Sequence, residues 1–180
     1  VIYNGFLSGV AFTGDRYFYP NPLACDGQRK FNMGARERSP WFDCACCPVN
    51  IVRFVPSIAG YVYAQRDDAA YVNLFVGGTG TLRVKGQTVK LTQETSYPWD
   101  GRVKIAVAPE RAADFAINVR IPGWVLSQVV PSDLYRYADP LPGKLTLKVN
   151  GKSVDLKVDK GFARVERTWK NGDLIEFNLP

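Results

Sequence analysis

Short runs of alternating apolar and polar residues fill the chain beyond about residue 67. Such alternation is typical of strands with one buried face, and Gly or Pro separates most of the runs. The runs cover residues 71–76, 81–84, 89–92, 103–107, 115–120, 145–149, 162–169 and 174–179. Asn150-Gly151 marks a two-residue hairpin and Asn171-Gly172 a second turn. The pattern predicts a β-sandwich over residues 67–180.

A helical periodicity precedes this region. The apolar residues that share the spacing are Ile51, Phe54, Val55, Ile58, Ala59 and Val62. Pro48 suits the first helical position, where its missing N–H would have no partner in any case. Pro56 lies inside the pattern and removes a hydrogen bond, so we expect the helix to be kinked or interrupted near Val52.

Residues 1–66 differ from the rest of the chain in composition. They are rich in aromatic residues, Pro and Cys, and turn residues punctuate residues 12–47. This composition predicts ordered loops with short strands, one of them within residues 15–20. The change of pattern divides the chain into segments 1–66 and 67–180. The expected fold class is mainly β: a β-sandwich preceded by a loop-and-helix segment.

The charge and hydropathy of the chain indicate which classes of partner to expect. The chain has 23 basic and 17 acidic residues, a net charge of +6, and its basic residues are scattered rather than gathered in a stripe. No apolar run approaches the roughly 20 residues of a membrane span. We therefore expect neither nucleic acid nor a membrane as a partner.

Three of the four cysteines, Cys44, Cys46 and Cys47, lie within four residues, directly before the predicted helix. Unpaired N–H groups at a helix N-terminus favour a thiolate, which can bind metal or act as a nucleophile. Structural disulfides and inert buried thiols are the alternatives, although a bond between the adjacent Cys46 and Cys47 would be strained. The spacing from Cys25 is not that of a zinc ribbon, so metal ligands from elsewhere are plausible. The chain has no histidine, the commonest general base and zinc nitrogen ligand.

The segment Trp-Phe-Asp-Cys-Ala-Cys-Cys-Pro-Val-Asn-Ile-Val-Arg-Phe at residues 41–54 resembles the cysteine motif of bacterial β-L-arabinofuranosidases, glycoside hydrolase families 127 and 146. Further stretches support the resemblance in order along the chain, at residues 3–5, 15–23, 60–63, 71–76, 97–99, 120–124 and 169–173. The resemblance therefore extends over nearly all of the chain.

This resemblance implies a mechanism. In the family an (α/α)6 barrel carries the site and β-sandwich domains follow it, so segment 1–66 would be the end of that barrel. Three cysteines and a glutamate hold zinc, one of these cysteines is the nucleophile of a retaining reaction, and a separate glutamate is the acid/base. Position in the motif matches Cys46 to the nucleophile, Cys46 and Cys47 to zinc ligands, and Tyr19 to a substrate-contacting tyrosine. Cys25 and Cys44 receive no role. The implied substrate is an arabinose-containing oligosaccharide or polysaccharide of plant type.

The resemblance also places essential groups outside these residues. The remaining zinc ligands, the acid/base glutamate and the substrate-binding histidines would lie upstream of Val1, and the chain lacks an initiator Met. We expect a piece of a longer bacterial polypeptide, cytoplasmic or exported, with an incomplete zinc site and no activity by itself. Exposed apolar residues such as Phe6, Phe12 and Phe54 should favour self-association. The alternative is a carbohydrate-binding or structural β-sandwich whose N-terminal cysteines hold a structural metal; a nucleic-acid-binding zinc module is a more distant third.

Overall fold

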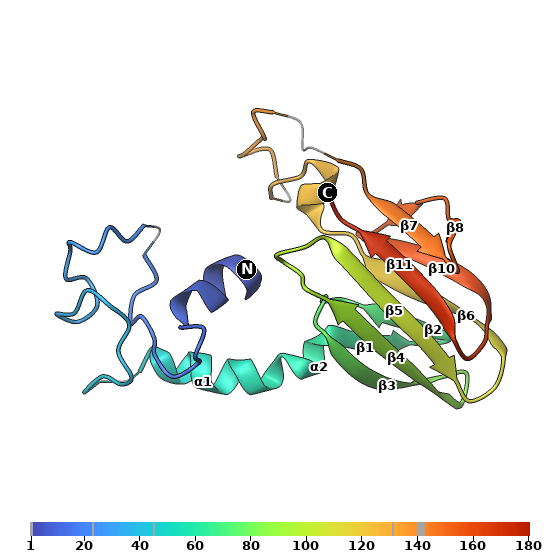
Figure 1. Ribbon diagram of the computed structural model, residues 1–180, viewed down its shortest axis with the longest axis horizontal. Helices are drawn as coiled ribbons and strands as arrows, with labels where there is room; N and C mark the ends of the chain where they lie inside the picture. The colour runs from blue at the N-terminus through green and yellow to red at the C-terminus, as the bar shows by residue number, and fades with distance from the viewer. Residues whose placement is uncertain (1, 23, 45, 131, 140–142) are drawn as a thin grey trace. The chain divides into compact units, whose positions relative to one another are not determined.

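The computed structural model describes residues 2–22, 24–44, 46–130, 132–139 and 143–180. Leu23 and Ala45, which belong to the stretches that carry the resemblance, lie outside the described residues. The chain divides into two compact units, residues 1–59 and residues 60–180 (Figure 1). The second unit begins before residue 67 because strand β1 (Tyr63–Arg66) pairs with strand β2 (Ala69–Val72) and so belongs to the sheets.

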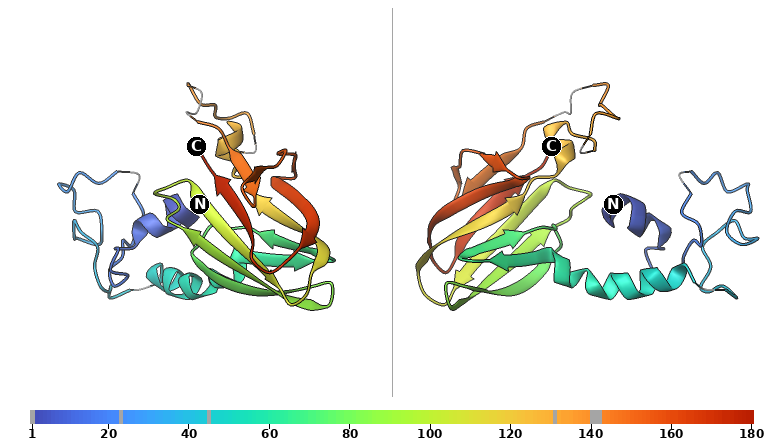
Figure 2. Two further views of the ribbon diagram at one scale, coloured as in Figure 1. Left: turned by 45° about the vertical axis from the view of Figure 1, so that its right-hand side comes forward. Right: turned by 180° about the vertical axis from the view of Figure 1, so that it is seen from behind.

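The second unit is a β-sandwich of two sheets, which confirms the predicted mainly-β fold class (Figures 1 and 2). The five-stranded sheet has the order β1-β2-β6-β10-β9, in which β2 and β6 are parallel. The six-stranded sheet has the order β3-β4-β5-β11-β7-β8 and is antiparallel throughout. The remaining bounds are β3 Gly78–Val84, β4 Gln87–Thr95, β5 Arg102–Pro109, β6 Ala113–Arg120, β7 Thr146–Val149, β8 Lys152–Ser153, β9 Val158–Asp159, β10 Phe162–Trp169 and β11 Asp173–Asn178, and a short 3-10 helix, η3 (Gly123–Leu126), follows β6.

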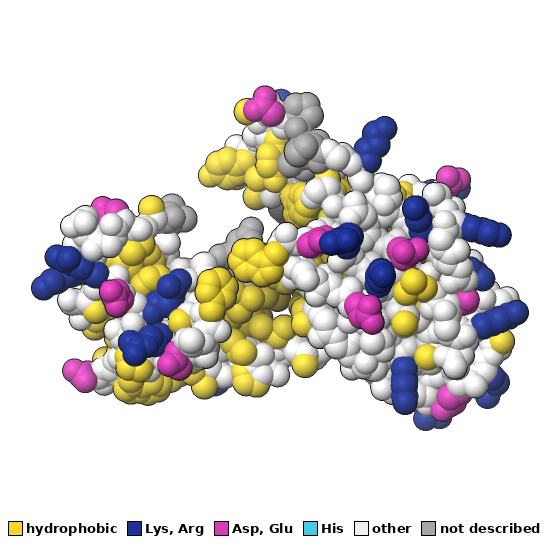
Figure 3. Space-filling model, viewed as in Figure 1, with side chains coloured by type: hydrophobic (Ala, Val, Ile, Leu, Met, Phe, Trp, Pro, Cys, Tyr) yellow, Lys and Arg dark blue, Asp and Glu magenta, His cyan; other side chains and the backbone are white. Residues whose placement is uncertain are grey.

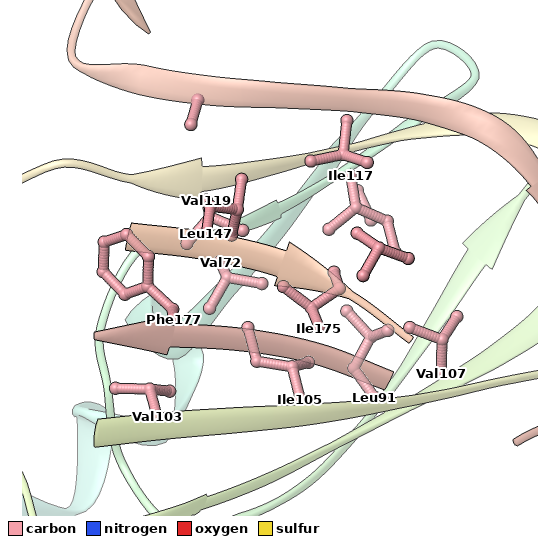
Figure 4. Packing of buried hydrophobic residues seen from close by; sticks show 14 of the residues in the cluster. Val72, Leu91, Val103, Ile105, Val107, Ile117, Val119, Leu147, Ile175 and Phe177 are labelled. Carbon is pink, nitrogen blue, oxygen red and sulfur yellow. The ribbon is translucent and has the colours of Figure 1, made fainter. Parts of the chain in front are cut away.

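One hydrophobic core lies between the two sheets. Alternate residues of β5 and β11, such as Ile105 and Ile175, pack with Ile117 and Val119 of β6 (Figure 4). Trp169 is completely buried, and its indole N–H donates a 3.0 Å hydrogen bond to the carbonyl of Phe115. This alternation is the feature that the sequence pattern detected, because side chains of period two fall on one face of a strand.

Most predicted strands are confirmed, and the differences have structural reasons. Asn150 and Gly151 both adopt left-handed backbone angles, φ 51° and 74°, in the two-residue turn from β7 to β8. The run predicted at 71–76 is wrong in its second half, because β2 ends at Val72. There the chain leaves the five-stranded sheet for β3 of the other sheet, and Phe75 packs into the core beside Phe177.

The first unit has little regular structure. It contains a π-helical turn η1 (Ile2–Phe6), a 3-10 turn η2 (Leu7–Gly9) and helix α1 (Pro48–Ser57), and the short helix α2 (Ala59–Val62) continues into the second unit. The strand predicted within residues 15–20 is wrong: only Tyr17 makes isolated bridges there, to Val10 and Ser39.

Helix α1 begins at Pro48, as the sequence predicts, but it is not interrupted near Val52. Pro56 removes a single ladder hydrogen bond, and the helix accommodates that loss and continues to Ser57. The break falls at Ile58, whose N–H bonds to the carbonyl of Val55 at 3.2 Å, one residue closer than in a regular α-helix.

The distribution of charged and apolar side chains on the surface can be compared with the partners expected from the sequence. On the face seen in Figure 3, Lys and Arg side chains are spread over the sandwich unit among acidic ones, without a continuous basic stripe. Among the described residues, no helix is long and apolar enough to cross a membrane. Phe12 is 98% exposed, whereas Phe6 and Phe54 cover each other in part, with ring centroids 4.7 Å apart. Self-association stays a prediction.

Replacing Trp169 by Ala should destabilise the sandwich by about 3–5 kcal/mol, because it empties a large buried site. It also leaves the carbonyl of Phe115 without its indole donor. Urea unfolding of the 180-residue chain, followed by far-UV circular dichroism, measures the change. Trp99→Ala, at a residue that is 79% exposed, is the matched control and should cost less than about 1 kcal/mol. Equal losses from the two variants would contradict the assigned core.

Candidate functional site

The structure brings together the three residues that the sequence singled out. The sulfur of Cys46 lies 2.7 Å from the hydroxyl oxygen of Tyr19, although the two residues are 27 positions apart. The same sulfur lies 3.8 Å from the sulfur of Cys47. A phenol and two thiols therefore meet at the start of helix α1.

The helix start positions both thiols. Cys47 is the N-cap residue of α1 and Pro48 is its first helical residue. The side chain of Asn50 donates a 3.2 Å hydrogen bond to the carbonyl of Cys46 and accepts one of 3.1 Å from Arg53. The Pro and the Asn of the cysteine motif thus have distinct roles: Pro48 begins the helix, and Asn50 holds the backbone of Cys46.

A buried amide holds the segment that carries Tyr19. Asn32 is 0% exposed, and its side-chain oxygen accepts a 2.6 Å hydrogen bond from the backbone N–H of Tyr19. Its side-chain nitrogen donates a 2.7 Å hydrogen bond to the carbonyl of Glu37. Sequence reasoning missed Asn32, because an Asn before Met33-Gly34 is typical of a simple turn residue. The turn exists, with positive φ at both Met33 and Gly34, but the amide also ties two loop segments together.

The ring of Tyr19 has a second support. Phe42 is buried and meets the Tyr19 ring edge to face, with centroids 5.3 Å apart. Phe42 belongs to the same sequence motif as Cys46. The motif therefore supplies both the sulfur and the surface against which the phenol rests.

Electrostatics favour an ionised Cys46. The hydrogen bond from Tyr19 lowers the pKa of the Cys46 thiol, and contacts with Cys47 and Cys44 add smaller effects in the same direction. The pKa of Tyr19 is raised well above its ordinary value, chiefly through the same bond to Cys46. Both shifts favour the arrangement in which the phenol keeps its proton and donates the hydrogen bond to the sulfur. An exposed thiolate of this kind is suited to nucleophilic attack or metal binding.

The four cysteines are free and exposed, so neither the disulfide nor the buried-thiol alternative describes them. The sulfur of Cys25 lies 4.0 Å from the carbonyl oxygen of Arg36. Cys44 contributes to the lowered pKa of Cys46 through a side-chain contact.

The thiol pair fits a zinc ion. Zinc–sulfur bonds of about 2.3 Å at tetrahedral angles place two ligand sulfurs about 3.8 Å apart. The sulfurs of Cys46 and Cys47 are separated by 3.8 Å. Within the described part of the chain, no group of three or more His, Cys, Asp or Glu residues is arranged to hold a metal. The pair thus offers two of the four donors that zinc ordinarily takes.

Comparisons with known proteins agree along the whole chain. Residues 1–60 match the family description "Beta-L-arabinofuranosidase, GH127 catalytic domain", and residues 69–180 match "Beta-L-arabinofuranosidase, GH127 middle domain". A curated relative, the non-reducing end β-L-arabinofuranosidase of Bifidobacterium longum subsp. longum, is 32% identical over 187 aligned residues, which cover 99% of this chain and 25% of the relative.

Solved structures give the same picture. A GH127 β-arabinofuranosidase superposes with a TM-score of 0.87 at 42% identity, over 99% of this chain and 27% of the other. A GH127 β-L-arabinofuranosidase from Geobacillus stearothermophilus T6 superposes with a TM-score of 0.77 at 36% identity, over 99% and 26%. This chain spans about a quarter of the length of these relatives. With both domain descriptions matched in order and the fold shared, the chain belongs to the GH127 β-L-arabinofuranosidase family.

Proposed function

We propose that this chain supplies the nucleophile and part of the metal site of a retaining, zinc-dependent β-L-arabinofuranosidase that acts on arabinose-containing glycans of plant type. The observation that supports this most directly is the 2.7 Å contact between the Tyr19 hydroxyl and the Cys46 sulfur beside a second thiol. The name of the Bifidobacterium relative points to arabinofuranose at the non-reducing end of the glycan.

Cys46 would act in two steps. First, its thiolate attacks the anomeric carbon, a carbon–sulfur bond forms, and the bond to the leaving oxygen breaks as a glutamic acid outside this chain protonates that oxygen. Second, the resulting glutamate takes a proton from water, whose oxygen attacks the same carbon and expels the sulfur. Two inversions at one carbon give net retention.

Tyr19 would have a different hydrogen-bond partner before and after the Cys46 sulfur bonds to the sugar. In the free site its hydroxyl donates to the thiolate and orients it. Once the carbon–sulfur bond forms, the sulfur loses its charge and becomes a weak acceptor. The hydroxyl can then bond to a sugar oxygen, and this reconciles the observed thiol contact with the substrate-binding role expected for Tyr19.

Cys46 and Cys47 are the residues of this chain that would hold zinc, in keeping with their tetrahedral sulfur spacing. Bound zinc would stabilise the ionised form of both thiols near neutral pH. The alternative of a structural metal site within the sandwich chain has less support, because the described residues gather too few donors to close a site.

Cys46→Ser, made in a polypeptide that spans the full length of the family, should lower turnover of an aryl β-L-arabinofuranoside at least about 10³-fold, since a hydroxyl is a far weaker nucleophile at neutral pH. Substrate binding should persist. Cys25→Ser is the matched control and should retain activity, because in the described part of the chain the Cys25 sulfur bonds to the carbonyl of Arg36 and not to Tyr19, Cys46 or Cys47. Retained turnover in Cys46→Ser would exclude the thiol as nucleophile.

Tyr19→Phe should raise the pKa of Cys46, because it removes the largest cause of the lowered value. Alkylation of Cys46 by iodoacetamide at neutral pH should then slow several-fold, with the midpoint of its pH profile displaced upward. Mass spectrometry of the reduced, metal-free chain measures both. Tyr17→Phe is the control, since the hydroxyl of Tyr17 bonds to the carbonyl of Gly14 instead. If the two variants gave identical profiles, the Tyr19–Cys46 bond would not control the thiol.

The purified 180-residue chain, kept reduced and dialysed, should hold much less than one zinc per molecule and should not hydrolyse arabinofuranosides. The physical reason is that it gathers two thiols where zinc takes four donors. Metal analysis, thiol titration and an activity assay on one preparation measure this. One tightly bound zinc per chain, or measurable turnover, would contradict a site shared with other residues.

A further inference from the structure

A groove of about 460 Å³ lies on the outer face of the five-stranded sheet, in the sandwich unit. Its lining includes one row of residues that are paired across four strands: Ala64 of β1, Tyr71 of β2, Asn118 of β6 and Arg164 of β10. The core-facing neighbours of this row, such as Val72 and Val119, point the other way. The pairing register of the sheet therefore builds the floor of the groove.

Asn118 places a buried amide in that floor. The residue is only 5% exposed, and its side-chain nitrogen donates a 3.2 Å hydrogen bond to the carbonyl of Ala70. Among the described residues its side-chain oxygen receives no hydrogen bond, and it is not one of the buried side-chain atoms left without a partner, so it is open to the groove. Water satisfies this oxygen in the free groove, and a hydroxyl of a bound ligand can take the place of that water.

Two aromatic rings form an apolar wall. Tyr71 and Phe162 are both half-buried and meet at right angles, with centroids 5.4 Å apart and an interplanar angle of 89°. The guanidinium of Arg120 lies 5.3 Å from the centroid of Phe162 and braces that ring. Rigid aromatic surface beside a few polar groups is the usual construction of a small-molecule site. A sugar presents a C–H face for such rings and hydroxyls for such amides.

The charged side chains that line the groove favour an anionic sugar over a neutral one. Arg66, Lys160 and Arg164 line it against one acidic residue, Asp159. Arg164 is partly neutralised by Glu166, at 3.1 Å, and Arg66 by Asp67, at 3.6 Å; both ion pairs are exposed to solvent and therefore weak. The lining itself carries three basic side chains against one acidic one, which favours an anion, and guanidinium groups match the geometry of a carboxylate.

We propose that this groove is a non-catalytic binding site for an acidic oligosaccharide, one that carries a carboxylated sugar. The rings of Tyr71 and Phe162 pack against the apolar face of a sugar. The side-chain oxygen of Asn118 accepts a hydrogen bond from a sugar hydroxyl, and the guanidinium of Arg164 forms an ion pair with the carboxylate. The choice of a glycan as occupant rests on the proposed function. An enzyme that hydrolyses sugars from a polymer binds that polymer more tightly when it has a second binding site for it. The site would raise the local concentration of substrate without taking part in the chemistry.

Calorimetry on the 180-residue chain with an oligogalacturonate of four residues tests the proposal. We expect saturable binding that Arg164→Gln weakens at least about fivefold through loss of the guanidinium–carboxylate pair. Phe162→Ala should weaken it by a similar factor. Arg83→Gln is the matched control, at an exposed arginine on strand β3 of the other sheet, and should leave binding unchanged. The carboxyl-reduced form of the same oligosaccharide should bind more weakly and be insensitive to Arg164→Gln.

Four outcomes would overturn the proposal: no saturable binding, binding that neither Arg164→Gln nor Phe162→Ala reduces, equal affinity for the neutral oligosaccharide, or loss of binding in the full-length Cys46→Ser protein. The last outcome would mean that another part of the polypeptide covers the groove. Binding is measured without turnover, so failure here leaves the role of Cys46 untouched. Conversely, unchanged activity of the full-length Cys46→Ser protein would contradict the proposed function and would leave the binding result in the groove unaffected.

Discussion

The cysteine site depends on one buried amide, that of Asn32. Between η2 and α1 the described chain has no strand ladder, so its backbone groups must find other partners. Asn32 meets this need at the decisive place, because its side chain bonds to the backbone of both Tyr19 and Glu37. The position of the Tyr19 hydroxyl, and through it the lowered pKa of the Cys46 thiol, follows from that anchoring.

The two units are stabilised in different ways. In the sandwich a continuous set of apolar side chains from both sheets is removed from water, and this burial drives its folding. In residues 1–59, Phe42 is the only aromatic residue among those described that is buried. A unit with so little core depends on local hydrogen bonds and on whatever covers its remaining apolar surface. This accords with its match to part of a larger catalytic domain.

The proposed chemistry and the proposed binding use the same physical device in different units. At Cys46 the proposed phenol donor would stabilise negative charge on a sulfur. In the groove, guanidinium groups and a buried amide would bind the proposed carboxylate and hydroxyl. In both places an almost fully buried asparagine, Asn32 or Asn118, carries the polar framework, because an amide can donate and accept at once.

Features that local sterics control could be predicted from the amino-acid sequence alone. Alternation of period two located most strands, the Asn150-Gly151 pair defined a hairpin, Pro48 defined a helix start, and the spacing of Cys46 and Cys47 indicated the site. Contacts between distant segments became visible only in the folded chain: the bond of Tyr19 to Cys46, the anchoring by Asn32, and the row from Tyr71 to Arg164. The same holds for the end of β2 at Val72, where the chain changes sheets. The physical reason is that periodicity reports which face of an element is buried. Which distant residue it meets there depends on strand register and loop closure, which no local pattern encodes.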